Sequence, residues 1–545
     1  MPGEVKKQVR RLEKQHSKLE TELNRLWWTI ANNTRSPEAQ RAAEVELRIK
    51  TLYKDQSVIG AVESDLQRMP LPPDRILARQ YEVLVKNFIR ERYPDDTRGK
   101  IVSIAALLEK KFSEYRPSLT IAGTKRKLTL NTIVAALKNE EDQNLRRRYW
   151  EAGKKVGRHL HRVRFLRLVE LRNEAARRAG FANFHHLSLS LGSLSPDWVD
   201  QLFQRLEEVT EAPYWEAKRE IDGKLAAHWK IAPDELMPWH YEDLFFQEVP
   251  QRVTFPLERL ITKNPVVPVS QLYRGLGLEL DGVLAQSDLF ERRFKNPHAF
   301  CIDIDRKGDV RILANVHRSF NWTVTLLHEA GHAAYFKYIN KRLPYLLREP
   351  AHTFITEGVA MLMQRLAYSP RWLEKAMEIP PEELRELEPE LRRIQRMDGL
   401  IFARWSLVMY HFEKQLYEDP EADLQQVWWD LKERYQGIRQ PPGREDEKDW
   451  LTKVHLVSNP VYYHNYTLGL LFSCQVLDSL KRRTPKGQDP FIGDVLGEAT
   501  KTTRATGRFL RKKIFSQGNK MSWEALVEHA TGSPLGVDAF CNWYL

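Results

Sequence analysis

Residues 300–334 read FCIDIDRKGDVRILANVHRSFNWTVTLLHEAGHAA, and this stretch decides the fold. From residue 300 to 314, apolar and polar residues alternate around Gly308 and Asp309, which predicts a hairpin or a small sheet. Helical periodicity resumes at about Asn321. A small sheet that leads directly into a helix, in a chain that is otherwise helical, predicts a mainly α protein. We expect one large helical bowl with a deep central cleft.

Helical periodicity also covers most of the remaining chain. Apolar residues at three- and four-residue spacing predict helices over residues 5–32, 37–67, 74–92, 131–152, 165–179, 196–227 and 382–417. The proline-rich residues 69–73 interrupt this pattern. No stretch has the composition of a linker, and no repeat of solenoid length occurs. We therefore expect residues 1–130 to form an N-terminal helical lid that is continuous with a body over residues 131–545.

The composition indicates a globular protein with a mixed, solvated surface. Of the 545 residues 42% are hydrophobic, and 15 tryptophans are available for a large core. The formal charge of +12 arises from 85 basic residues interleaved with 73 acidic ones. No nucleic-acid reading motif accompanies this charge, so we expect neither nucleic acid nor a membrane as a partner. The oligomeric state is left open.

The cysteines and the N-terminus favour a cytoplasmic protein. Cys301, Cys474 and Cys541 lie far apart and lack metal-ligand spacing, which fits a reducing compartment. Residues 1–26 are dense in Lys, Arg and Glu, unlike a secretory signal. No window approaches the ~20 apolar residues of a membrane-spanning helix.

The sequence HEAGH at residues 328–332 lies within the helical pattern that follows the predicted hairpin. Residues four apart on a helix lie on the same face, so the imidazoles of His328 and His332 can reach one point. Glu329 falls beside them and can act as a general base. This is the arrangement of a zinc peptidase, against the alternatives of chance occurrence or a buried structural histidine pair. We expect one zinc ion per chain.

A catalytic zinc needs a third protein ligand and an open position. Downstream, residues 354–363 read FITEGVAMLM, an apolar helical pattern with one acid, Glu357. A lone carboxylate on such a face is costly to bury unless it is paired or ligating. Glu357 is therefore the predicted third ligand. The alternative is an exposed glutamate near a helix N-terminus, where the helix dipole favours it.

These blocks resemble the angiotensin-converting-enzyme family of peptidyl-dipeptidases, in the wider group of thimet-type oligopeptidases and carboxypeptidase Taq. The likeness runs from about residue 139 to 480. It includes RNEAARRAGFANF (172–184), PHAF (297–300), LLHEAGHAAYF (326–336) and TEGVAMLM (356–363). It continues through KVHLVSNPVYYHNYTLGLLFSCQ (453–475), whose last ten residues also look like carboxypeptidase Taq.

The resemblance implies zinc on His328, His332 and Glu357, with Glu329 as the base, and it assigns substrate contacts to further residues. His298 and Ala299 match the pair on the edge strand that holds the substrate backbone. Lys453 and Tyr463 match the residues that bind the terminal carboxylate. His455 matches a substrate-binding histidine, and Tyr466 the tyrosine that stabilises the oxyanion. Without this resemblance, aromatic residues at such a spacing belong more often to a hydrophobic core than to a catalytic site.

The chain also departs from the family pattern. One extra residue separates His455 from the tyrosine pair, so Tyr462 and Tyr463 are alternatives for the same role. Asn465 stands where the family often has a chloride-coordinating arginine. Glu357 lies one residue later than in the family. The family's glutamine contact to the substrate carboxylate has no assigned counterpart.

The sequence therefore predicts a zinc metallopeptidase that acts on short peptides and releases C-terminal dipeptides. An endo-acting oligopeptidase and a carboxypeptidase of the same zinc group are the nearest alternatives. A metal-binding but inactive relative is a third, although a degenerate copy tends to lose its base first and Glu329 is intact. The last alternative is a basic nucleic-acid or membrane-surface protein in which the motif is incidental.

Overall fold

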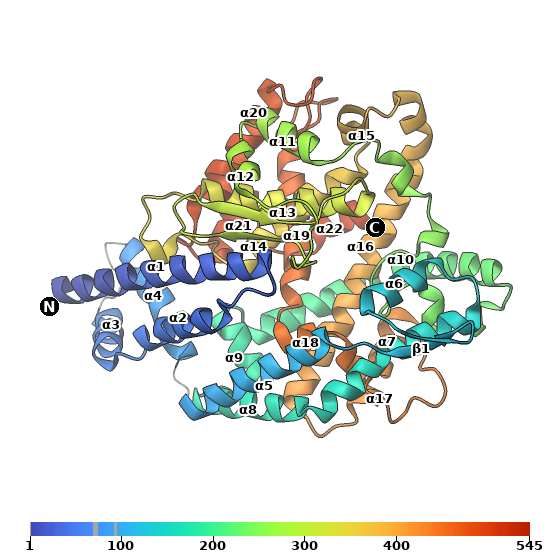
Figure 1. Ribbon diagram of the computed structural model, residues 1–545. Coiled ribbons are helices and arrows are strands. Elements are labelled where there is room, and N and C mark those ends of the chain that lie inside the picture. Colours follow the sequence, from blue (N-terminus) through green and yellow to red (C-terminus); the bar gives the residue numbers. More distant parts are fainter. Residues whose placement is uncertain (1, 69–74, 92–94) are drawn as a thin grey trace. The chain divides into compact units, whose positions relative to one another are not determined.

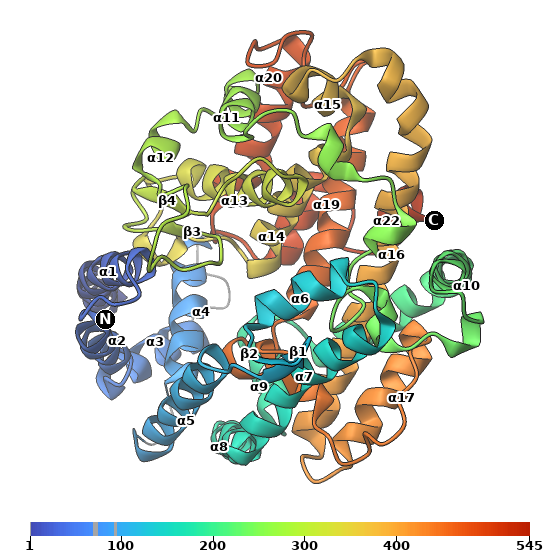
Figure 2. The same ribbon diagram turned by 45° about the vertical axis from the view of Figure 1, so that its right-hand side comes forward.

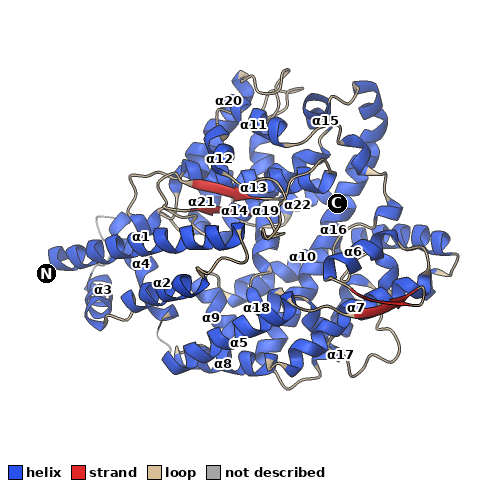
Figure 3. Ribbon diagram, in the orientation of Figure 1, coloured by secondary structure: helices blue, strands red, loops and turns tan. Residues whose placement is uncertain are grey.

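The computed structural model describes residues 2–68, 75–91 and 95–545. Helices form most of this part of the chain, and its strands form two antiparallel two-stranded sheets (Figure 3), which confirms the prediction of a mainly α protein. The residues group into two compact units. The first consists of Met1–Arg92, Leu257–Leu391 and Leu468–Phe540, and the second of Tyr93–Pro256, Arg392–Thr467 and Cys541–Leu545. That residues 1–130 act as a lid on one body stays a prediction.

Four helices begin the first unit: α1 (Pro2–Asn32), α2 (Ala39–Leu52), α3 (Gln56–Arg68) and α4 (Arg75–Arg90). Helices α1 and α2 lie side by side (Figures 1 and 2) and bury Leu19, Leu26 and Val45. The single helix predicted over residues 37–67 is wrong. Helix α2 ends at Leu52 and α3 begins at Gln56. Just before α3, the Asp55 carboxylate accepts a hydrogen bond from the Ser57 backbone N–H at 3.0 Å. The predicted break at residues 69–73 lies outside the described residues.

The hairpin predicted from alternation is present in the first unit. Strands β3 (Phe300–Asp303) and β4 (Val310–Leu313) pair with Phe300 opposite Leu313. Helix α13 (Phe320–Tyr338) follows, with the Ser319 hydroxyl accepting a hydrogen bond from the Trp322 N–H at its start. The hairpin packs on α13, as Figure 2 shows. This contact holds a strand edge beside the helix that carries the HEAGH sequence.

Helix α14 (Thr353–Gln364) packs along α13. The contact is very close at Gly331, where a Cβ atom would lie 2.7 Å from the Ala360 Cα. Only glycine allows this approach of the two backbones. The unit also contains α11 (Val266–Gly275), α12 (Asp281–Gln286), α15 (Pro370–Met377), α20 (Lys501–Phe509) and α21 (Trp523–Thr531). Helices α16 (Pro381–Glu418) and α19 (His464–Arg483) contribute residues to both units.

The second unit contains a short hairpin and seven further helices among the residues described. The hairpin consists of β1 (Ser118–Ile121) and β2 (Thr124–Lys127), which the sequence reading did not predict. The helices are α5 (Asp95–Ser113), α6 (Leu130–Asn139), α7 (Gln143–Arg162), α8 (Phe165–Arg178), α9 (Phe184–Leu191), α10 (Pro196–Trp229) and α17 (Leu424–Gln436). Two short helices, α18 (His455–Ser458) and α22 (Asp538–Tyr544), complete the described α-helices of the chain.

One predicted helix of the second unit is also wrong in its extent. The periodicity over residues 131–152 continues through two helices, α6 and α7, with a break between them. Asp142 causes the break, because its carboxylate accepts hydrogen bonds from the N–H groups of Asn144 and Leu145 at 2.8 and 3.2 Å. An N-cap inside an apolar pattern starts a new helix. Among the described helices, none combines the length and the hydrophobicity that crossing a membrane requires.

Candidate metal centre

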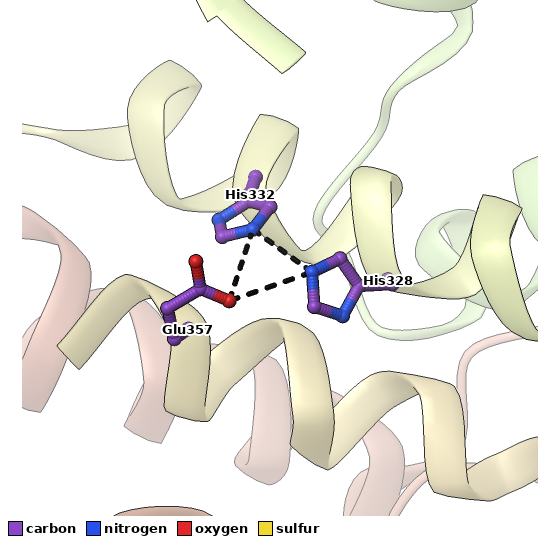
Figure 4. Close-up of side chains that lie close together, drawn as sticks. All are labelled: His328, His332 and Glu357. Carbon is purple, nitrogen blue, oxygen red and sulfur yellow. Dashed lines mark hydrogen bonds and ion pairs between the residues drawn. The ribbon is translucent and has the colours of Figure 1, made fainter. Parts of the chain in front are cut away.

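Three side chains of the first unit converge between α13 and α14 (Figure 4). The Nε2 atoms of His328 and His332 lie 3.2 Å apart, and the Glu357 Oε2 lies 3.5 and 3.8 Å from them. A tetrahedral ion with bonds of about 2.1 Å separates its ligand atoms by about 3.4 Å. The spacing of the three atoms therefore fits a zinc ion, as do two imidazoles and one carboxylate as donors.

Helix geometry brings these three side chains together. His328 and His332 are one turn apart on α13, and α14 presents Glu357 to them from the facing helix (Figure 4). Burial lowers the pKa of His332 well below its ordinary value, and the neighbouring His328 adds to this. A neutral imidazole is the form that binds a metal. The Glu357 side chain is only 9% exposed, so the alternative of an exposed helix-start glutamate does not describe it.

Two polar residues of α14 orient the histidines. The Nδ1 atom of His328 lies 2.7 Å from the Gln364 Oε1, and that of His332 lies 2.7 Å from the Thr356 Oγ1. A hydrogen bond from Nδ1–H to either oxygen fixes the tautomer that leaves Nε2 free for a metal. Neither residue was predicted to have this role from the sequence. Their signal was present, because Thr356 and Gln364 are polar positions in an otherwise apolar helix.

We expect Gln364→Ala to weaken zinc binding by about 10–100-fold without removing it, because His328 loses the acceptor that orients its ring. Competition of the purified protein with a chromophoric chelator measures this change. Gln475→Ala is the matched control, since the Gln475 amide donates to Ser533 and Pro534 within the same unit instead. Equal zinc affinity for wild type and Gln364→Ala would show that the ring is held by packing alone.

Glu329 lies on the same helix, and it is 8% exposed. Burial, with a smaller contribution from the nearby Glu357, raises the pKa of its carboxyl to about 7. The positive field of His328 and a hydrogen bond from the Cys301 backbone N–H oppose this rise. That hydrogen bond ties β3 to α13. A carboxyl group whose pKa lies near neutrality can accept and release a proton in one catalytic cycle.

His298 and Ala299 lie directly before β3 and not within it, since the strand begins at Phe300. The His298 side chain is exposed, and its backbone N–H donates to the Asn296 Oδ1 at 2.9 Å. The family resemblance implied that the pair lies on the edge strand itself, so the strand is shorter than expected. Their contact with a substrate backbone stays a prediction.

Lys453 is the centre of a separate polar group in the second unit. Its ammonium donates to the Gln247 Oε1 at 2.7 Å, and it lies 5.0–5.3 Å from the ring centroids of Phe245, Trp405 and Tyr463. Burial lowers the pKa of Lys453 to about 8, while Asp243 and Glu248 oppose the shift. Gln247 was missed because it lies 206 positions away in the chain, with no motif around it.

The other aromatic candidates gather in the same unit. The His455 ring lies 5.4 Å from Tyr463 and 6.3 Å from Tyr466, and the two tyrosine rings are 5.4 Å apart. The Tyr463 hydroxyl accepts a hydrogen bond from the Trp405 indole at 2.7 Å. Tyr462 packs on Tyr466 instead, with 5.1 Å between the rings. The contact with Lys453 favours Tyr463 over Tyr462 as its partner.

The chain is similar to known proteins over most of its length. The family model described as angiotensin-converting enzyme matches residues 3–211 and 291–544. The angiotensin-converting enzyme of Mesocricetus auratus is 23% identical over 428 residues, which is 72% of this chain and 31% of that protein. The inactive angiotensin-converting enzyme-related protein of Caenorhabditis elegans is 20% identical over 415 residues, 67% of this chain and 44% of that protein.

The chain thus spans less than half the length of either of these relatives. The family match nevertheless covers most of this chain, including α13, α14 and the residues around Lys453. The chain therefore belongs to the angiotensin-converting-enzyme family of peptidases.

Proposed function

We propose that this protein is a zinc-dependent peptidase that removes dipeptides from the C-terminus of short peptides. The observation that carries the proposal is the convergence of His328, His332 and Glu357, with the buried Glu329 on the same helix. The intact Glu329 supports an active enzyme, although one relative is named as inactive. The family match supports peptides as substrates.

Bound zinc would supply a Lewis acid that polarises the scissile carbonyl and lowers the pKa of water. Glu329 takes a proton from the attacking water and later delivers it to the leaving amine. Its raised pKa suits both steps. Tyr466 donates a hydrogen bond to the developing oxyanion, and His455 assists it. One such donor is worth about 2.7–4 kcal/mol in other hydrolases.

Lys453 binds the C-terminal carboxylate of the substrate, together with Tyr463 and Gln247. Burial among three aromatic rings strips water from the ammonium, which strengthens its attraction for a carboxylate. Gln247 Oε1 accepts one of the three ammonium protons and so orients the other two. We assign to Gln247 the role of the family's carboxylate-binding glutamine. His298 and Ala299 hold the peptide backbone in this proposal.

Amidation of the peptide C-terminus is expected to lower kcat/KM by about 10–100-fold, because a charge-assisted hydrogen bond to Lys453 is lost. The preference for the free acid should shrink above pH 8, since Lys453 is charged below its pKa of about 8 and neutral above it. Lys453→Ala should abolish the preference at every pH. Rates on one peptide in acid and amide form, measured from pH 6 to 9, test this.

The products of the acid peptide identify the mode of cleavage. Mass spectrometry should find dipeptides released stepwise from the C-terminus. Internal cuts at equal rates in acid and amide peptides would instead favour an endo-acting oligopeptidase. Single released residues would favour the activity implied by the carboxypeptidase Taq likeness. The proposal of zinc chemistry holds in all three cases, because it depends on α13 and α14 only.

A further inference from the structure

A recess of about 590 Å³ in the first unit has six basic residues among the fifteen that line it. It lies between α1, the start of α4, the turn of the β3–β4 hairpin and the segment after α13. One acid lines it, Glu13, which is buried and accepts hydrogen bonds from the Gln80 amide and the Leu346 N–H. The basic residues that line it are Lys6, Arg10, Lys14, Lys307, Arg342 and Arg348.

Four of these cations lack an acidic partner. These four residues are Arg10, Lys14, Lys307 and Arg342. Within the described parts of the chain, no carboxylate lies within 4.0 Å of their side-chain nitrogens. The neighbouring Arg306, by contrast, is paired with Glu20 at 2.8 Å and with Glu349 at 3.3 Å. Lys6, Arg10 and Lys14 also follow one another at four-residue spacing on α1, where like charges repel. An anion in the recess would remove this repulsion.

The side chains of Arg10, Lys14, Lys307 and Arg342 are exposed, so a ligand in the recess can reach all four. The volume of the recess lies within the range of small-molecule pockets. Val9, Leu343 and Pro344 supply an apolar wall. The Arg348 Nε donates to the Leu343 carbonyl at 2.7 Å, which fixes this guanidinium before any ligand arrives. A second hollow of about 770 Å³ shares Lys14, Ser17 and Lys307 with the first. Its lining adds three basic residues and two acids, which are Lys18, Arg25, Arg41, Glu22 and Glu38, and Arg41 is paired with Glu22 at 2.8 Å.

We propose that this recess, defined by Arg10, Lys14, Lys307 and Arg342, binds a compact polyanion with several clustered phosphate groups. A single monovalent anion cannot neutralise the cations that face it, whereas a chain or ring of phosphates can contact them together. The cations come from three separate segments of the chain. A bound polyphosphate therefore links α1 to the hairpin turn and to the segment after α13. This site is independent of the proposed peptidase activity.

Tripolyphosphate is the probe for this site, in calorimetric titration of the 545-residue chain at low salt. Tripolyphosphate should bind with an affinity that falls as salt rises, and orthophosphate should bind at least about tenfold more weakly. Arg10→Ala combined with Lys14→Ala should weaken tripolyphosphate binding by about fiftyfold, since each lost charged contact costs roughly five- to tenfold. Hydrogen exchange in α1 should slow when tripolyphosphate binds to the wild type.

Lys7→Ala combined with Arg11→Ala is the matched control. These residues are exposed on the same helix at the same spacing, and neither lines the recess. Unchanged tripolyphosphate binding by the control variant supports the site. Equal losses of binding in both double variants would mean that binding depends only on the general positive charge of α1. Absence of tripolyphosphate binding by the wild type, with no binding to vesicles that contain phosphatidylinositol bisphosphate, would overturn the proposal. Binding to such vesicles alone would identify the phosphate source as a lipid headgroup.

Discussion

Glu329→Gln is expected to lower kcat by about 10²–10⁴-fold while the fold and the zinc are retained. The amide has nearly the same shape as the carboxyl group, but it cannot accept the proton of the attacking water. Glu329 is buried, and the amide adds no volume at this position, so substrate binding should change little. The loss should therefore appear in kcat rather than in KM.

Metal content, thermal unfolding and peptide turnover are measured together to separate chemistry from folding. Glu374→Gln provides the matched control, because Glu374 lies on α15 in the same unit and forms ion pairs with Arg371 and Lys375. It should keep near wild-type turnover. A Glu329→Gln protein with more than about a tenth of the wild-type kcat would assign the base to another residue.

His328→Ala and His332→Ala should each weaken zinc binding by about 10²–10⁴-fold, because few ligands share a binding free energy on the order of 10–16 kcal/mol. Elemental analysis after dialysis should find about one zinc per wild-type chain and little in either variant. Peptide turnover should fall with the zinc content. Chelation of the wild-type protein should produce the same loss, and added zinc should reverse it.

His317→Ala is the control for these substitutions. His317 is exposed, lies three residues before α13 and packs its ring on Trp322. Its variant should keep full zinc content. Full zinc content in both His328→Ala and His332→Ala would show that α13 does not bind the metal, and it would contradict the proposed mechanism.

The sequence predicted the helical class well, because apolar spacing along a segment reports which face of that segment is buried. The breaks at Asp55 and Asp142 were missed for a physical reason. In each case the apolar pattern continues across the break, while a single carboxylate satisfies backbone N–H groups and starts a new helix. The short β1–β2 hairpin was missed because β2 is fully exposed and shows no alternation. The bowl and its central cleft stay a prediction.

The sequence by itself determined the pair of histidines and the adjacent acid, because helix periodicity places residues four apart on one face wherever the helix lies. It also pointed to Glu357 as a carboxylate on an apolar helix. Tertiary structure decided the rest. Gly331 sets how closely α13 and α14 approach, and only that approach brings Gln364 and Thr356 to the outer nitrogens of the two imidazoles. Such contacts join separate elements, so no local pattern encodes them.

The same holds for Gln247, which meets Lys453 from a loop 206 positions earlier, and for the cations of the basic recess. Along the chain those cations read as ordinary charges on α1 and in two loops. That Arg10, Lys14, Lys307 and Arg342 lack an acidic partner among the described residues becomes visible only where the fold brings the three segments together. Spacing within one helix is a property of the sequence, whereas the distance between two elements depends on how their surfaces pack.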